Sequence, residues 1–193
     1  ERIDQAKPNV DARLHDGSRL NAQISPITEK GLQITIRRFK QDIDIETLIR
    51  NKAASREVME FLKYAVKLRM NIMIAGGTSS GKTTWLNNLA SFIDENLWIV
   101  TIENPAELRL QHEKVRSLVA RRPNMENKGE YTMADAVKES LRMNPDIIIV
   151  GEIRREEALD LLQAMGTGHE GSLGTAHANS AEDLLNFRFP DMI

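Results

Sequence analysis

Gly76-Gly77-Thr78-Ser79-Ser80-Gly81-Lys82-Thr83 is the stretch of this 193-residue sequence that decides its fold. It matches the pattern G-x-x-x-x-G-K-[ST] without a mismatch. At average residue usage, such a match arises by chance in roughly one chain of this length in a hundred. A short apolar run, residues 71–75, precedes the loop, and apolar residues follow it at the spacing of a helix face: Leu86, Leu89, Ala90 and Ile93. The order strand, glycine-rich loop, helix is therefore predicted.

This loop predicts a binding site for a nucleoside triphosphate. Its backbone N–H groups point inward, and the first turn of the following helix adds unpaired N–H groups and a favourable dipole. We expect the Lys82 ammonium to reach the β- and γ-phosphates and the Thr83 hydroxyl to ligate Mg²⁺. The expected cofactors are thus ATP and Mg²⁺. The expected nucleotide-binding residues of the loop are Gly76, Gly77, Thr78, Ser79, Ser80, Gly81, Lys82, Thr83 and Thr84. The alternative is a glycine-rich turn before an ordinary helix.

The composition is that of a globular protein. Hydrophobic residues make up 41% and charged residues 28% of the chain, which argues against disorder. No apolar run approaches the roughly 20 residues of a membrane span. The net charge of -2 excludes a global basic field for nucleic acid. The absence of cysteine excludes disulfides and thiolate zinc sites. Because the chain begins at Glu1 instead of Met, we expect an excised fragment.

Two parts are expected along the chain. Residues 1–42 are predicted to be a partial β-rich domain, with strands at 10–14, 19–24 and 32–36. Residues 43–55 are predicted to be a linker. From residue 56 to 193, strands and helices alternate, which predicts an α/β fold with a mostly parallel, helix-covered sheet. We expect helices near 132–143 and 155–165, with capping pairs Thr132–Asp135 and Ser180–Asp183, and a mobile loop at 125–130.

A second acidic element follows the apolar run 146–150. Gly151 and then Glu152 end this strand, and parallel strands present their chemistry at their carboxyl ends, beside the phosphate loop. A carboxylate there can hold the Mg²⁺ shell or polarise the attacking water. The alternative is a strand followed by a surface glutamate.

Four motifs in order resemble those of the type II/type IV secretion ATPases. Residues 141–154 (LRMNPDIIIVGEIR) resemble the Walker B box, and 167–180 (TGHEGSLGTAHANS) resemble the His box. Residues 101–108 (TIENPAEL) look like the acidic Asp box of that family. The phosphate loop is the fourth motif. Residues 11–21 and 32–39 also match the Tad/Flp pilus branch. The resemblance implies a RecA-like P-loop core, truncated at its C-terminus, behind part of a smaller, PAS-like α/β domain.

The resemblance also implies roles for individual residues. Glu103 is the candidate for positioning or deprotonating the attacking water, and Glu152 is the Walker B carboxylate, nearer Mg²⁺. The sequence does not divide the base role between them. Asn104 stands where the family often carries Asp, which puts any role for that position in doubt.

His177 is expected to bond the γ-phosphate or to relay to a neighbouring subunit, and the alternative is a surface histidine between glycines. For His169, a functional role and a surface histidine between glycines are equally supported. Arg37 and Arg38 lie where the family places arginines that swing over the triphosphate, and their alternative is a solvated pair at a strand end. Arg154 is a weaker candidate for a phosphate or subunit contact.

The implied function is Mg²⁺-dependent ATP hydrolysis that powers pilus assembly or protein secretion. The implied assembly is a homo-hexamer on an inner-membrane platform protein, at the cytoplasmic face of the cell membrane. A DNA-translocating or conjugation motor is the main alternative, against which the acidic balance and the few aromatic residues argue. A second alternative is a module that binds ATP with little turnover. The resemblance weakens after Asn186, where the chain reads FRFP instead of the family's Arg-Leu.

Overall fold

The structure, a computed structural model, describes residues 2–38, 43–124 and 126–193. The chain divides into two compact units, an N-terminal unit of residues 1–42 and a C-terminal unit of residues 43–193. The segment 43–55, expected to be a linker, contains helix α1 (Ile45–Arg50) and belongs to the C-terminal unit. Phe39 and Met125, which fall in segments singled out from the sequence, lie outside the described residues.

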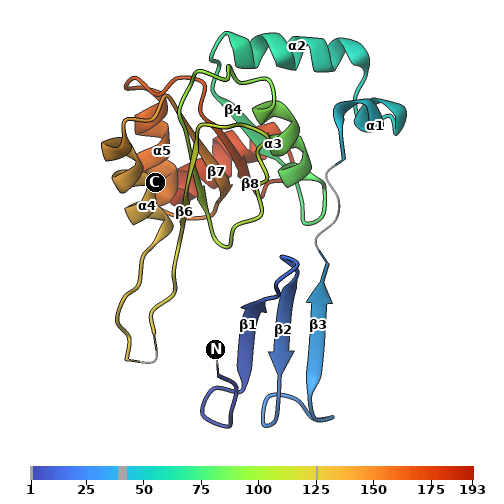
Figure 1. Ribbon diagram of the computed structural model, residues 1–193, viewed down its shortest axis with the longest axis vertical. Helices are drawn as coiled ribbons and strands as arrows, with labels where there is room; N and C mark the ends of the chain where they lie inside the picture. Colours follow the sequence, from blue (N-terminus) through green and yellow to red (C-terminus); the bar gives the residue numbers. More distant parts are fainter. Residues whose placement is uncertain (1, 39–42, 125) are drawn as a thin grey trace. The chain divides into compact units, whose positions relative to one another are not determined.

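The N-terminal unit is a three-stranded antiparallel sheet in the order β1-β2-β3. Its strands are β1 (Asn9–Arg13), β2 (Arg19–Gln23) and β3 (Gln33–Arg37), close to the predicted ranges (Figure 1). A tight turn joins β1 to β2. Gly17 adopts a positive φ of 86° there, a conformation that suits glycine because it has no Cβ. The Asp16 carboxylate accepts a hydrogen bond from the Ser18 N–H (2.9 Å).

Residue alternation separates the two faces of this sheet. Val10 lies opposite Ala22, and Ala22 opposite Ile34, so these apolar side chains share one face. Val10 and Ala22 are buried, whereas Ile34 is 54% exposed. The other face is polar, since the residues on either side of each of these apolar positions are polar or charged.

The C-terminal unit is built on a five-stranded sheet in the order β4-β8-β7-β5-β6. Every pairing in it is parallel. The strands are β4 (Ile72–Ala75), β5 (Ile99–Glu103), β6 (Val115–Val119), β7 (Ile147–Ile153) and β8 (Leu173–Ala176). The central strands are buried apolar runs, as a sheet covered on both faces requires. The predicted α/β class is thus confirmed.

Helices cover both faces of this sheet (Figure 1). Ile147 and Ile149 of β7 pack in one core cluster with α2 (Arg56–Lys67) and α3 (Lys82–Ala90). Ile148 and Val150 pack in the other. That second cluster takes side chains from α4 (Met133–Ser140), α5 (Glu157–Met165) and α7 (Phe189–Met192). The remaining short elements are η1 (Leu141–Met143), α6 (Ala181–Asp183) and η2 (Leu184–Arg188).

Strand β7 carries a bulge at its carboxyl end. Val150 pairs with Gly174 and Ile153 with Ala176, so β7 advances three residues where β8 advances two. Ile153 therefore returns to the core face of Ile148 and Val150, although plain alternation places it on the opposite face.

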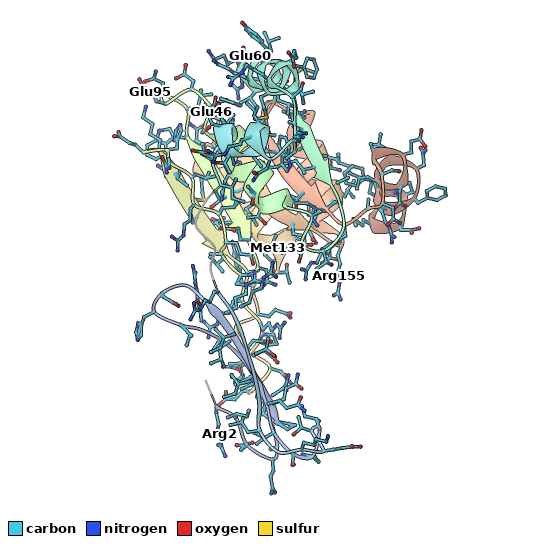
Figure 2. All side chains as sticks on the ribbon, turned by 90° about the vertical axis from the view of Figure 1, so that its right-hand side faces the viewer. Arg2, Glu46, Glu60, Glu95, Met133 and Arg155 are labelled. Carbon is cyan, nitrogen blue, oxygen red and sulfur yellow. The ribbon has the colours of Figure 1, made fainter. Side chains whose placement is uncertain are left out.

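The predicted capping pairs are confirmed. The Thr132 hydroxyl accepts a hydrogen bond from the Asp135 N–H (3.0 Å), and the Asp135 carboxylate accepts one from the Thr132 N–H (3.0 Å). This reciprocal pair satisfies two N–H groups at the start of α4. The Ser180 hydroxyl likewise accepts a bond from the Asp183 N–H (3.0 Å). On the outer surface, an ion pair between Arg56 and Glu46 joins α2 to α1 (3.0 Å; Glu46 is labelled in Figure 2).

Within residues 2–38, 43–124 and 126–193, no helix is long and apolar enough to cross a membrane.

Leu86 on α3 is fully buried in the cluster that holds this helix to the sheet. Replacing it by alanine is expected to lower the free energy of unfolding by about 2 to 5 kcal/mol, because the lost contacts leave a cavity. Urea unfolding followed by tryptophan fluorescence measures this change. Leu185, which is 61% exposed, is the matched control, and L185A should change stability by no more than about 0.5 kcal/mol. Equal losses from both substitutions would contradict the described packing.

Candidate nucleotide site

The glycine-rich loop follows β4 and wraps closely on itself. Gly76 donates its N–H to the carbonyl of Ala176 at the end of β8 (3.3 Å). A Cβ on Gly76 would lie 2.5 Å from the Ser80 Oγ, so a larger residue there would displace the Ser80 side chain. Gly81 caps α3 with a φ of 90°, which glycine adopts readily. The predicted strand, loop and helix thus occur in the predicted order.

The Lys82 ammonium lies across this loop. Its Nζ donates to the carbonyl oxygens of Gly76 (2.9 Å) and Gly77 (2.8 Å). Partial burial lowers the pKa of Lys82 from its usual 10.5, the nearby Glu152 charge raises it, and the Arg154 charge lowers it. The positive charge is therefore held inside the loop by carbonyl dipoles and by one neighbouring carboxylate.

A chain of polar contacts leads from this lysine to the bulged end of β7. The Nδ1 of His177, directly after β8, lies 3.5 Å from the Lys82 Nζ, and its Nε2 lies 2.5 Å from the Glu152 Oε1. The Glu152 Oε2 accepts hydrogen bonds from the Arg154 guanidinium, with Nε at 2.8 Å and Nη2 as the second donor. A neutral imidazole with its proton on Nε2 satisfies both contacts of His177. Both Glu152 oxygens therefore have partners.

Glu103, the last residue of β5, is buried with 4% of its surface exposed. Its Oε1 accepts hydrogen bonds from the backbone N–H groups of Glu107 (2.6 Å) and Leu108 (2.7 Å). Gly151 leaves room for this side chain, since a Cβ at that position would lie 3.1 Å from the Glu103 Cγ. The Thr175 hydroxyl donates to the Gly151 carbonyl (2.7 Å). These contacts join the ends of β5, β7 and β8.

The structure brings together most of the residues of the C-terminal unit that were expected to form the site, but not His169. The structure brings the loop, Lys82, Glu152 and His177 together, and places Glu103 against the glycine before Glu152. His169 lies elsewhere: its Nδ1 lies 3.0 Å from the carbonyl oxygen of Pro145, just before β7 begins. The seven residues of β7, at about 3.3 Å each, put roughly 20 Å between the two ends. The structure therefore favours a structural role for His169.

Arg37 and Arg38 belong to the N-terminal unit, and their part in the site stays a prediction. Arg13 lies opposite Arg19, and Arg19 opposite Arg37, so these three side chains share one face at one end of the sheet. Reasoning from the sequence did not identify Arg13 or Arg19, because the signal is the strand register and not a motif.

Thr83 and Glu152 offer the chemistry that Mg²⁺ requires. Mg²⁺ prefers hard oxygen ligands, and typically takes few from the protein and the rest from phosphates and water. A hydroxyl and a carboxylate fit that pattern. Within the described part of the chain, no group of three or more His, Asp or Glu residues could hold a metal by itself.

Comparisons with known proteins agree with this fold. A putative conjugal transfer protein of Mycobacterium tuberculosis is 37% identical over 190 residues, which are 95% of this chain and 54% of that protein. The VirB11 ATPase of the Brucella suis type IV secretion system, in complex with sulphate, superposes with a TM-score of 0.63 at 28% identity over 100% of this chain and 62% of that one. The pilus retraction motor PilT with bound ADP gives a TM-score of 0.67 at 27% identity over 96% of this chain and 51% of that one.

This chain is shorter than the curated proteins it resembles, spanning from 25% to 60% of their lengths. The type II/IV secretion system protein family matches residues 2–192, nearly the whole chain. The phosphate loop, the Glu152 strand end and His177 all lie within this match. The chain therefore belongs to the type II/IV secretion system protein family.

Proposed function

We propose that this chain carries the ATP-hydrolysing centre of a secretion or pilus-assembly motor. The observation that supports this most is the chain of contacts from the loop through Lys82 and His177 to Glu152. It places a cation, a histidine and a carboxylate beside a loop of N–H donors. Phosphoryl transfer needs such positioning and electrostatic stabilisation more than it needs covalent chemistry from the protein.

Nucleotide binding in this proposal changes the partners of Lys82. The ammonium exchanges the carbonyl oxygens of Gly76 and Gly77 for phosphate oxygens, and the loop N–H groups and the start of α3 bind the remaining phosphate charge. Mg²⁺ held by the Thr83 hydroxyl and the Glu152 carboxylate would neutralise charge on the phosphates. His177, released from Lys82, would take up a second proton on Nδ1, so that Nδ1–H donates to the γ-phosphate while Nε2–H keeps its bond to Glu152.

The assembly in which this site works is also part of the proposal. Family membership and the names of the solved relatives support a motor that acts with a membrane complex. We infer a homo-hexamer bound to a platform protein at the cytoplasmic face of the inner membrane. In it, Arg37 and Arg38 stabilise the triphosphate.

Lys82→Ala is expected to reduce phosphate release at least about 100-fold in the full-length protein, because the transition-state charge loses its principal cation. Glu152→Gln is expected to retain nucleotide binding and lose turnover to a similar extent. Steady-state phosphate release with ATP and Mg²⁺ measures turnover, and a fluorescent ATP analogue measures affinity. Lys128, whose side chain is 76% exposed, provides the control K128A, which should retain turnover. Undiminished hydrolysis in K82A would refute the proposal, and negligible turnover in the wild type would favour a module that only binds ATP.

The proposed role of Arg37 gives a separate expectation. Arg37→Ala should lower kcat at least about tenfold without unfolding the N-terminal unit, because a fixed positive charge near the transferring phosphoryl group stabilises it. Lys30→Ala removes an equal charge from an exposed position of the same unit and serves as the control. If both variants hydrolyse ATP at the wild-type rate, Arg37 is a solvated strand-end residue.

The names of several relatives favour a second candidate, a conjugation motor that acts on DNA. The net charge of -2 argues against it. For a protein-secretion motor, duplex and single-stranded DNA should each change ATPase activity by less than about twofold. Stimulation of more than about fivefold that falls steeply between 50 and 200 mM salt would favour the DNA motor, because phosphate contacts release counterions.

A further inference from the structure

The connection between β5 and β6 is unusual for a parallel pair. These neighbouring strands are parallel, and such strands are usually joined through a helix. Residues 104–114, which connect them, contain no helix. The backbone N–H and C=O groups of this crossover therefore lack the partners that a helix would supply, and they bond side chains or water instead.

Glu103 provides partners at the start of the crossover. Two backbone N–H groups, those of Glu107 and Leu108, converge on its Oε1 at 2.6 and 2.7 Å. A carboxylate oxygen has about two lone-pair sites, so these two bonds occupy the acceptor capacity of Oε1. Glu103 itself is buried, and its two bonds to the crossover are partly buried.

The crossover continues from Glu103 to the phosphate-loop helix. The Arg109 N–H donates to the Asn87 side-chain oxygen on α3 (3.1 Å). Leu108 and Leu110 pack against the core cluster that contains Leu86 and Leu89. The segment after β5 is thus bonded to the buried Glu103 carboxylate through Glu107 and Leu108, and to α3 through Arg109.

Glu103 also fixes the backbone that carries Glu152. A Cβ on Gly151 would lie 3.1 Å from the Glu103 Cγ and 3.4 Å from its Oε1. The first distance is tighter than ordinary van der Waals contact, and the second lies at the lower limit of such contact. Glu103 therefore fills the space that Gly151 leaves, next to the bulge that positions Glu152.

We propose that Glu103 is a positioning residue: its carboxylate clamps residues 104–110 and supports the Gly151–Glu152 backbone beside Lys82. This proposal rests on the proposed function and divides the two carboxylates that the sequence left unassigned. Glu103 bonds the protein's own N–H groups, and Glu152 is the carboxylate in contact with His177 next to the lysine. Glutamine can replace such a clamp in part, because its side-chain oxygen still accepts N–H bonds. A general base cannot be replaced in this way.

Hydrogen exchange of the full-length protein without nucleotide tests the clamp directly. In Glu103→Ala, exchange in peptides covering residues 104–110 should rise at least tenfold, while peptides covering α5 remain unchanged. In Glu103→Gln, exchange in 104–110 should stay within threefold of the wild type. This measurement does not depend on ATPase activity, so it remains decisive even if the Lys82 variants refute the proposed function.

Kinetics of the same variants separate positioning from chemistry. E103Q should hydrolyse ATP at least tenfold faster than E103A, because its side-chain oxygen still accepts the two N–H bonds. If E103Q and E103A are equally inactive while both keep residues 104–110 protected, the charge of Glu103 acts on the reaction and the clamp is refuted.

A second variant covers the case in which E103A does not fold. Gly151→Ala leaves Glu103 in place but puts a methyl group in its space, and exchange in 104–110 should rise at least threefold. Gly166→Ala is the matched control, because its Cβ would have its nearest neighbour at 3.6 Å. G166A should leave exchange in 104–110 unchanged. Full protection of 104–110 in G151A would overturn the proposed packing.

Discussion

The hydrogen bonds from the Lys82 ammonium to the carbonyl oxygens of Gly76 and Gly77 are the interaction on which the site depends. A partly buried cation is costly unless polar groups compensate for the lost water. Without a ligand, the loop supplies two such groups from its own backbone. The loop thus holds its own lysine in place, and a phosphate has to exchange partners with it rather than organise a disordered chain.

The parallel sheet makes this arrangement possible. Strands β4, β7 and β8 run in the same direction, so the loop, Glu152 and His177 all emerge at one edge. The two core clusters hold those strands between helices on both faces. A site assembled from the ends of buried strands moves little, which suits chemistry that depends on fixed charges.

Features carried by short local patterns could be predicted from the sequence. The strand–loop–helix order around the phosphate loop, the parallel α/β core and the capping pair of Thr132 follow from spacing and apolar periodicity, and they are confirmed. The secretion-ATPase family was predicted from the resemblance of four motifs, and it is confirmed as well. Features that depend on which segments meet in space could not be predicted. His169 and His177 lie in the same glycine-rich segment, yet β8 separates them and carries them to opposite ends of the sheet. The shared face of Arg13, Arg19 and Arg37 depends on strand register, and the partners of Glu103 depend on the path of a crossover without a helix.

The bulge in β7 resolves a conflict between two neighbours of that strand. In plain alternation, consecutive residues face opposite sides of a sheet. Yet Gly151 must leave space for Glu103, and Glu152 beside it must reach His177, before Ile153 returns to the apolar core. One extra residue lets a single strand meet all three demands. The length of the chain between Val150 and Ile153 is therefore as much a part of the site as the identity of any side chain in it.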